Sequence, residues 1–175
     1  MLIYKIRDKL LASGLKQCPM RGTKREHGLV PEAASSGIAM ASSRAASQIL
    51  IVEDELILAK RVARQLERQG YGIAGINTTG RAALEHFERC QPDLVLMNIA
   101  LPGDWDGIET AARIRERAEI SIIYLTAYAS EATLARAEAT GGAYGYLTKP
   151  YQERDLHATV KMALTQHQMQ QRECT

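Results

Sequence analysis

The sequence predicts an α/β fold in which a parallel five-stranded sheet is covered by helices on both faces. Short, almost continuously apolar runs alternate with longer segments of helical period, and the alternation repeats five times between residues 48 and 167. Strands without polar alternation are typical of a parallel sheet buried on both sides. The runs expected to form strands are ILIV (49–52), GIAGI (72–76), LVLM (94–97), SIIYL (121–125) and GYL (145–147).

The segments between these runs carry apolar side chains at three- and four-residue spacing, as on the buried face of a helix. In the first segment Leu58, Val62 and Leu66 have this spacing, and the helix should stop at Gly70. Residues able to cap helix N termini precede the later segments: Thr78 or Thr79, Asp106 and Ser130. Five such units favour a doubly wound, flavodoxin-like sheet with strand order 2-1-3-4-5 and five helices, although periodicity alone does not determine the order.

The chain is expected to contain one domain with an extension at each end. Residues 1–47 are rich in small and charged residues and carry eight Lys/Arg against three Asp/Glu. We expect this segment to be a disordered N-terminal extension, with Met40 as a possible true start. Its scattered positive charges favour a solvated leader over a nucleic-acid-binding arm. Residues 48–167 should form the domain, and residues 168–175 a helical tail or linker.

Composition excludes several classes of protein. Hydrophobic residues make up 46% and charged residues 24% of the chain, the balance of a soluble globular protein. The longest apolar runs have strand length, so we expect no membrane span. Cys18, Cys90 and Cys174 are odd in number and form no CxxC pair, which argues against a disulfide framework or a zinc site. We therefore expect a cytoplasmic protein.

Polar residues follow four of the five predicted strands. Glu53, Asp54 and Glu55 follow the first, Asn98 the third, Thr126 the fourth, and Thr148-Lys149-Pro150 the fifth. Ligands of open α/β sheets bind beyond the carboxyl ends of the strands, near the point where the strand order reverses. The sequence thus brings carboxylates, an amide, a hydroxyl and an amine to one edge of the sheet, where a ligand site is expected.

Four stretches of the sequence resemble the signatures of the receiver domain, the CheY-like module of two-component signalling. They are ILIVEDE (49–55), PDLVLMNIALPGDWDGIE (92–109), IIYLTAYA (122–129) and GYLTKPY (145–151), in the family's order and at its spacing. The resemblance implies a response regulator receiver in phosphorelay signal transduction that is not an enzyme and works by docking to other proteins. The implied partners are a sensor histidine kinase or phosphotransfer protein and a downstream signalling protein.

The resemblance also implies a role for each residue that matches a family motif. The implied Mg²⁺ ligands are Glu53, Asp54, the side chain at position 98 and the backbone carbonyl of Ala100. The implied switch and phosphate-contacting residues are Thr126, Ala127, Tyr146 and Lys149. The peptide bond between Lys149 and Pro150 should be cis, as in the receivers that this sequence resembles.

The sequence departs from the family at the phosphate-accepting position, where Asn98 replaces Asp. A carboxamide cannot form an acyl phosphate. Asp93 lies five residues upstream, on the order of 16 Å away along a strand, and cannot substitute. We therefore expect no phosphorylation at Asn98 and weak Mg²⁺ binding. Two alternatives stay open: a natural, phosphorylation-independent pseudo-receiver, or a receiver in which Asn98 replaces a native Asp.

Other functional classes fit the residues less well. A haloacid-dehalogenase-like phosphatase needs a nucleophilic Asp and a second acid two residues later, and Glu53-Asp54-Glu55 has the wrong order. A flavin-binding flavodoxin needs a Ser/Thr-rich phosphate loop where this chain has acids. Residues 168–175 leave no room for a helix-turn-helix, so we expect no DNA-binding domain in this sequence.

Overall fold

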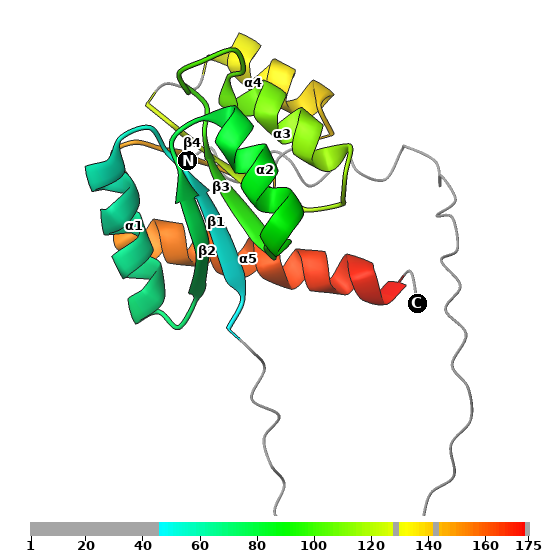
Figure 1. The fold of residues 1–175 in the computed structure, drawn as a ribbon. Helices are drawn as coiled ribbons and strands as arrows, with labels where there is room; N and C mark the ends of the chain where they lie inside the picture. Colours follow the sequence, from blue (N-terminus) through cyan, green and yellow to red (C-terminus); the bar gives the residue numbers. More distant parts are fainter. Residues whose placement is uncertain (1–45, 128–129, 142–143, 174–175) are drawn as a thin grey trace, which may run out of the picture. The chain divides into compact units, whose positions relative to one another are not determined.

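The computed structural model describes residues 46–127, 130–141 and 144–173, so the expectations for residues 1–45 lie outside the described residues. Its five strands form one parallel sheet with the order β2-β1-β3-β4-β5, which confirms the predicted order (Figure 1). The strands are β1 (Gln48–Val52), β2 (Gly72–Asn77), β3 (Leu94–Asn98), β4 (Ser121–Thr126) and β5 (Gly145–Thr148). The helices are α1 (Leu56–Arg68), α2 (Gly80–Cys90), α3 (Gly107–Arg115), α4 (Glu131–Ala139) and α5 (Glu153–Glu173).

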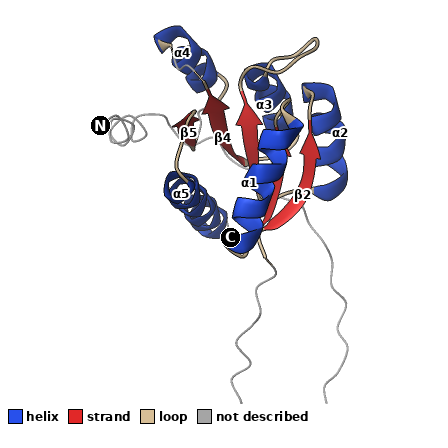
Figure 2. Ribbon diagram, turned by 90° about the vertical axis from the view of Figure 1, so that its left-hand side faces the viewer, coloured by secondary structure: helices blue, strands red, loops and turns tan. Residues whose placement is uncertain are grey.

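Helices cover both faces of the sheet, as a doubly wound fold requires (Figure 2). One apolar core lies between the sheet and helices α1 and α5, and the other lies between the sheet and helices α2, α3 and α4. Successive residues of a strand point to opposite faces. Ile49 and Ile51 therefore enter the first core and Leu50 and Val52 the second. This explains why the residues from Ile49 to Val52 are all apolar.

Side-chain caps start three of the helices where the sequence predicted them. The Thr79 hydroxyl accepts from the backbone of Ala82 at 3.4 Å, and the Ser130 hydroxyl accepts from the backbone of Thr133 at 3.1 Å. Asp106 forms a complete capping box with Glu109 at the start of α3. Each cap satisfies a backbone N–H that has no partner within its helix.

Helix α5 runs without interruption from Glu153 to Glu173. Because the helix continues past residue 167, no break in it marks the predicted end of the domain there, and that boundary stays a prediction. Within the described part of the chain, no helix is both long and apolar enough to cross a bilayer.

Candidate functional site

The carboxyl ends of four strands meet at one edge of the sheet and bring the predicted site residues together. Glu53 follows β1, Asn98 ends β3, Thr126 ends β4 and Lys149 follows β5. The backbone N–H of Lys149 donates to the carbonyl of Thr126 at 2.7 Å, which holds the residue after β5 against the end of β4. The Lys149–Pro150 peptide bond is cis, as the resemblance implied.

An ion pair joins the first strand to the loop after the fifth. The Lys149 ammonium donates to Glu53 Oε2 at 2.6 Å, and the exposed fractions of the two side chains are 18% and 1%. Burial raises the pKa of the Glu53 carboxyl, and the neighbouring ammonium of Lys149 opposes that rise. The ammonium of Lys149, which reaches Glu53 from the loop after β5, therefore offsets part of the cost of burying this carboxyl group.

The side-chain amide of Asn98 points its nitrogen at the groups that the resemblance implied as metal ligands. Nδ2 lies 2.7 Å from Asp54 Oδ1, 2.9 Å from the carbonyl oxygen of Ala100 and 3.2 Å from Glu53 Oε1. All three partners are acceptors, so they select the amide orientation that presents the nitrogen and not the oxygen. Asn98 is itself buried. The two N–H donors of the Asn98 amide thus serve three acceptor oxygens, and the contacts with Asp54 and Ala100 are the two shorter ones.

Receiver domains generally bind Mg²⁺ at this acidic site. Here oxygens of Glu53, Asp54 and Ala100 surround a common point, as oxygen ligands of Mg²⁺ would. The Asn98 nitrogen, a hydrogen-bond donor that cannot ligate a cation, is directed at the same oxygens. Among the described residues, no group of three or more His, Cys, Asp or Glu side chains could hold a metal ion. The set as it stands does not fit a tightly bound metal.

The other predicted phosphate-contacting residues lie beside this network. Thr126 is buried at the end of β4, and the adjacent Ala127 is exposed. Their contacts with a phosphate stay a prediction.

The predicted switch residue, Tyr146, stacks on a second tyrosine that sequence reasoning did not assign to the site. The rings of Tyr146 and Tyr124 are 5.7 Å apart between centroids and inclined by 21°. The two residues are register partners on β4 and β5, so the strand alignment would have revealed the pair. Burial raises the pKa of Tyr146 to about 12. The switch role of Tyr146 stays a prediction.

Trp105, in the loop between β3 and α3, makes cation–π contacts with two guanidinium groups. Arg81 approaches the ring centroid to 4.8 Å and Arg113 to 4.1 Å. The indole is partly buried and packs against the second core. At the end of the same loop, Arg136 of α4 pairs with Asp106 at 2.7 Å. These cation contacts tie the loop after Asn98 to helices α2, α3 and α4.

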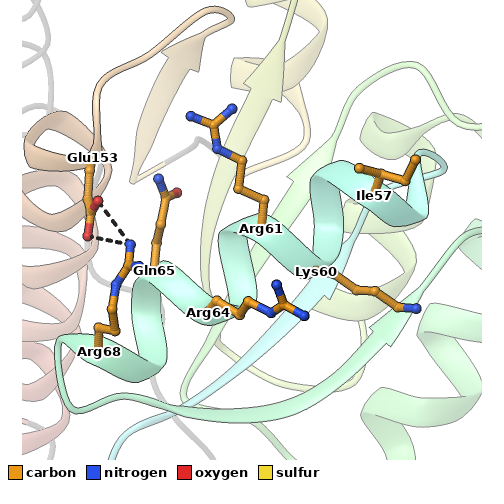
Figure 3. Close-up of a pocket in the computed structure, with 7 residues that line it drawn as sticks. All are labelled: Ile57, Lys60, Arg61, Arg64, Gln65, Arg68 and Glu153. Atoms are coloured by element: carbon orange, nitrogen blue, oxygen red, sulfur yellow. Dashed lines mark hydrogen bonds and ion pairs between the residues drawn. The ribbon is translucent and has the colours of Figure 1, made fainter.

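A basic groove runs along α1, outside the strand-end site (Figure 3). It has a volume of about 550 Å³ and is lined by Ile57, Lys60, Arg61, Arg64, Gln65, Arg68 and Glu153. Arg68 pairs with Glu153 at 3.2 Å, and Figure 3 shows Arg61 and Gln65 rising from the same side of the helix. Sequence reasoning missed this groove, although the spacing of Lys60, Arg64 and Arg68 at i, i+4 and i+8 was a signal that could have shown it.

The sheet order, the buried acid–lysine pair and the residues at the strand ends define a receiver-type α/β signalling module. The family model described as response regulator receiver domain matches residues 49–161. The chain belongs to this family, and its fold is the CheY-like fold.

Relatives and solved structures agree with this assignment. The chain is 35% identical over 118 residues to the transcriptional regulatory protein PdtaR of Mycobacterium tuberculosis, covering 67% of this chain and 57% of the relative. It is 37% identical over 121 residues to the sensory transduction protein RegX3 of Mycobacterium bovis, covering 67% of this chain and 51% of that relative. The chain thus spans about half the length of the curated relatives that it matches.

Two solved structures show the likeness in three dimensions. The signal receiver domain of a modulated diguanylate cyclase from Desulfovibrio desulfuricans G20 superposes with a TM-score of 0.67 at 34% identity, covering 71% of this chain and 98% of that one. A CheY-like receiver domain protein from Methanospirillum hungatei JF-1 also gives a TM-score of 0.67, at 28% identity, with the same coverage of 71% and 98%.

Proposed function

We propose that this chain is a receiver module that works by docking to signalling proteins without being phosphorylated at Asn98. The observation that carries the proposal is the contact of Asn98 Nδ2 with Asp54, Ala100 and Glu53. A carboxamide lacks the carboxylate oxygen that an acyl phosphate requires. Its nitrogen also satisfies the acceptors that would otherwise attract a cation, so Mg²⁺ binding should be weak.

The basic groove on α1 supports docking as the means of signalling. Lys60, Arg61 and Arg64 bring three positive charges to one helix, and the apolar side chains of Leu56 and Ile57 at its start are 51% and 88% exposed. Exposed large apolar residues beside a charged stripe are typical of a protein interface. We propose that the partner presents an acidic face with an apolar contact, and that it is a sensor histidine kinase or phosphotransfer protein.

The test of the site is a phosphorylation assay that compares the full chain with its Asn98→Asp variant. Both proteins are incubated with acetyl phosphate and Mg²⁺ and examined by intact-mass spectrometry. We expect no phosphoryl group on the original chain and a base-labile one on the variant, because the pocket around residue 98 is otherwise complete. Labelling of the original chain would overturn the proposal. An unlabelled variant would show that the pocket no longer supports the chemistry, as in a pseudo-receiver.

The test of docking uses the Asn98→Asp background, so that phosphotransfer reports on the encounter. A charge reversal of the groove, Arg61→Glu with Arg64→Glu, should slow transfer from purified histidine kinases by at least about tenfold, because steering and contact are lost together. Labelling by acetyl phosphate should not change, because this small phosphodonor reacts without docking of a second protein to α1. Arg89→Glu, an exposed residue of α2, is the matched control. Equal effects of the two reversals would refute a specific docking role for α1.

A further inference from the structure

A second polar cluster lies where β4 meets the C-terminal ends of α3 and α4. Its centre is Tyr124 of β4, whose side chain is completely buried in the second core. The Tyr124 hydroxyl has no hydrogen-bond partner among the described residues. Most buried polar groups of proteins are hydrogen-bonded, so a hydroxyl at this depth without a partner calls for an explanation.

Arg115, the last residue of α3, supplies the positive charge of this cluster. Its Nη1 donates to the backbone carbonyl of Thr140, the C-cap residue of α4, at 3.2 Å. One guanidinium thus meets the C-terminal ends of two helices, whose dipoles favour a cation. The other terminal nitrogen, Nη2, is buried and donates to no described residue, and Arg115 forms no ion pair within the described part of the chain.

The guanidinium of Arg115 lies close to the Tyr124 hydroxyl. Burial raises the pKa of Tyr124, and the positive charge of Arg115 is the largest influence that opposes the rise. Thr140 lies near the same hydroxyl, but its own hydroxyl already donates to the carbonyl of Ala137 at 2.8 Å. Arg115 Nη2 and the Tyr124 hydroxyl are therefore two neighbouring donors that no acceptor among the described residues uses.

Tyr146 covers Tyr124 without sharing this position. The two rings stack with centroids 5.7 Å apart, and the Tyr146 hydroxyl is also buried without a partner among the described residues. Arg115, however, acts on the pKa of Tyr146 through charge alone, and less than burial, Tyr124 and Glu138 do. The two tyrosines are thus a matched pair of buried hydroxyls, of which that of Tyr124 is the one beside the guanidinium.

We propose that Arg115 Nη2 and the Tyr124 hydroxyl bind a small monovalent anion, of the size of chloride or formate. An anion accepts from both donors and balances the guanidinium charge, whereas a water molecule would leave that charge unbalanced. The acids whose charges reach the two tyrosines do not supply this balance. Asp106 is paired with Arg136 at 2.7 Å, and Glu138 is exposed. The inference does not depend on the proposed function.

The first test follows the melting temperature of the full chain as sodium chloride or sodium formate replaces sodium gluconate, whose anion is too large for the site, at constant ionic strength. We expect a rise of at least about 3 °C at about 200 mM of either small anion, because a ligand that binds only the folded state stabilises it. Arg115→Gln and Tyr124→Phe should each lose most of this rise. Their matched controls, Arg117→Gln and Tyr146→Phe, should keep it, because Arg117 lies on the surface in ion pairs with Glu88 and Glu116.

The second test observes binding directly, through the broadening of the chloride NMR line by the full chain. We expect formate to reverse the broadening, Arg115→Gln to remove most of it and Arg117→Gln to leave it unchanged. A melting temperature that depends on ionic strength alone, equal losses in Tyr124→Phe and Tyr146→Phe, or broadening that survives Arg115→Gln would each overturn the proposal. The partner of the Tyr124 hydroxyl would then be a water molecule or Thr140.

Discussion

Replacing Asn98 by Asp should destabilise the folded chain and make its stability depend on Mg²⁺. In the original chain, the amide nitrogen donates to Asp54 Oδ1 at 2.7 Å and to the Ala100 carbonyl at 2.9 Å. A carboxylate at this position removes both donors. It also places a negative oxygen beside Asp54 and near the buried Glu53, which lies 3.2 Å from the present nitrogen.

The size of the effect follows from these contacts. Each lost hydrogen bond to a charged or buried acceptor costs about 1–3 kcal/mol. Two like charges at about 4 Å repel by about 4 kcal/mol at an effective dielectric constant of ~20, and rotation and hydration of the new carboxylate relieve much of that. We expect a net loss of about 2–4 kcal/mol in the free energy of unfolding without metal. For a domain of this size, that loss corresponds to a fall in Tm of about 10 °C.

Mg²⁺ should restore the stability of the Asn98→Asp variant and leave the original chain nearly unchanged. A cation that binds only the folded state stabilises it in proportion to the logarithm of its concentration over its Kd. Urea unfolding and thermal melts with and without about 10 mM Mg²⁺ measure this linkage, and calorimetry gives the affinity. A control at the same ionic strength in NaCl separates specific binding from screening. The reasoning is refuted if the metal-free variant is as stable as the original chain, or if Mg²⁺ stabilises both chains equally.

Three other substitutions test the contacts around the site. Lys149→Met should cost about 3–5 kcal/mol near neutral pH, because it leaves the buried carboxylate of Glu53 without its cation. Burial already raises the pKa of Glu53, and the substitution would raise it further. In urea unfolding, the loss of stability caused by Lys149→Met should therefore shrink as pH falls toward 4.5, the ordinary pKa of a glutamate side chain. A loss of stability that stays constant with pH would contradict this reasoning. Asp106→Ala should lower the free energy of unfolding by about 1–2 kcal/mol, because it removes the capping box of α3. The control Asp104→Ala removes only an exposed ion pair and should lower it by less than about 0.5 kcal/mol. Equal losses of stability in thermal melts of the two variants would refute this distinction. Tyr146→Phe should change the free energy of unfolding by less than about 0.5 kcal/mol or raise it, because the buried Tyr146 hydroxyl has no hydrogen-bond partner among the described residues. A loss of stability above about 1 kcal/mol would show that this hydroxyl does have a hydrogen-bond partner.

The fold was predictable from the sequence because both faces of the sheet are buried. The interior of each central strand had to be apolar, as Ile49 to Val52 are, and such runs stand out between amphipathic helices. Helix starts at Thr79, Asp106 and Ser130 were predictable because a capping side chain acts within its own turn. The strand order was less accessible, since it depends on pairing between segments far apart in the chain.

The site was predictable in its membership and not in its contacts. Strand ends deliver Glu53, Asn98 and Lys149 to the same edge in any parallel sheet of this order. The orientation of the Asn98 amide, however, is decided by acceptors on two other segments, including a backbone carbonyl in the loop that follows it. The stacking of Arg81 and Arg113 on Trp105 escaped prediction for the same reason, because it joins α2, α3 and a loop.

The complete acidic pocket beside Asn98 does not by itself require a history of phosphorylation in this chain. Glu53 and Lys149 connect β1 to the loop after β5 through a partly buried ion pair, and loss of Lys149 leaves the buried carboxylate of Glu53 without its cation. Asp54 accepts the shortest hydrogen bond of the Asn98 amide and so helps to hold the end of β3 to the residues after β1. Each of these residues therefore has a structural task that remains when phosphate and metal are both absent. Selection for stability alone would retain them, and an intact pocket is compatible with a receiver whose output comes from docking.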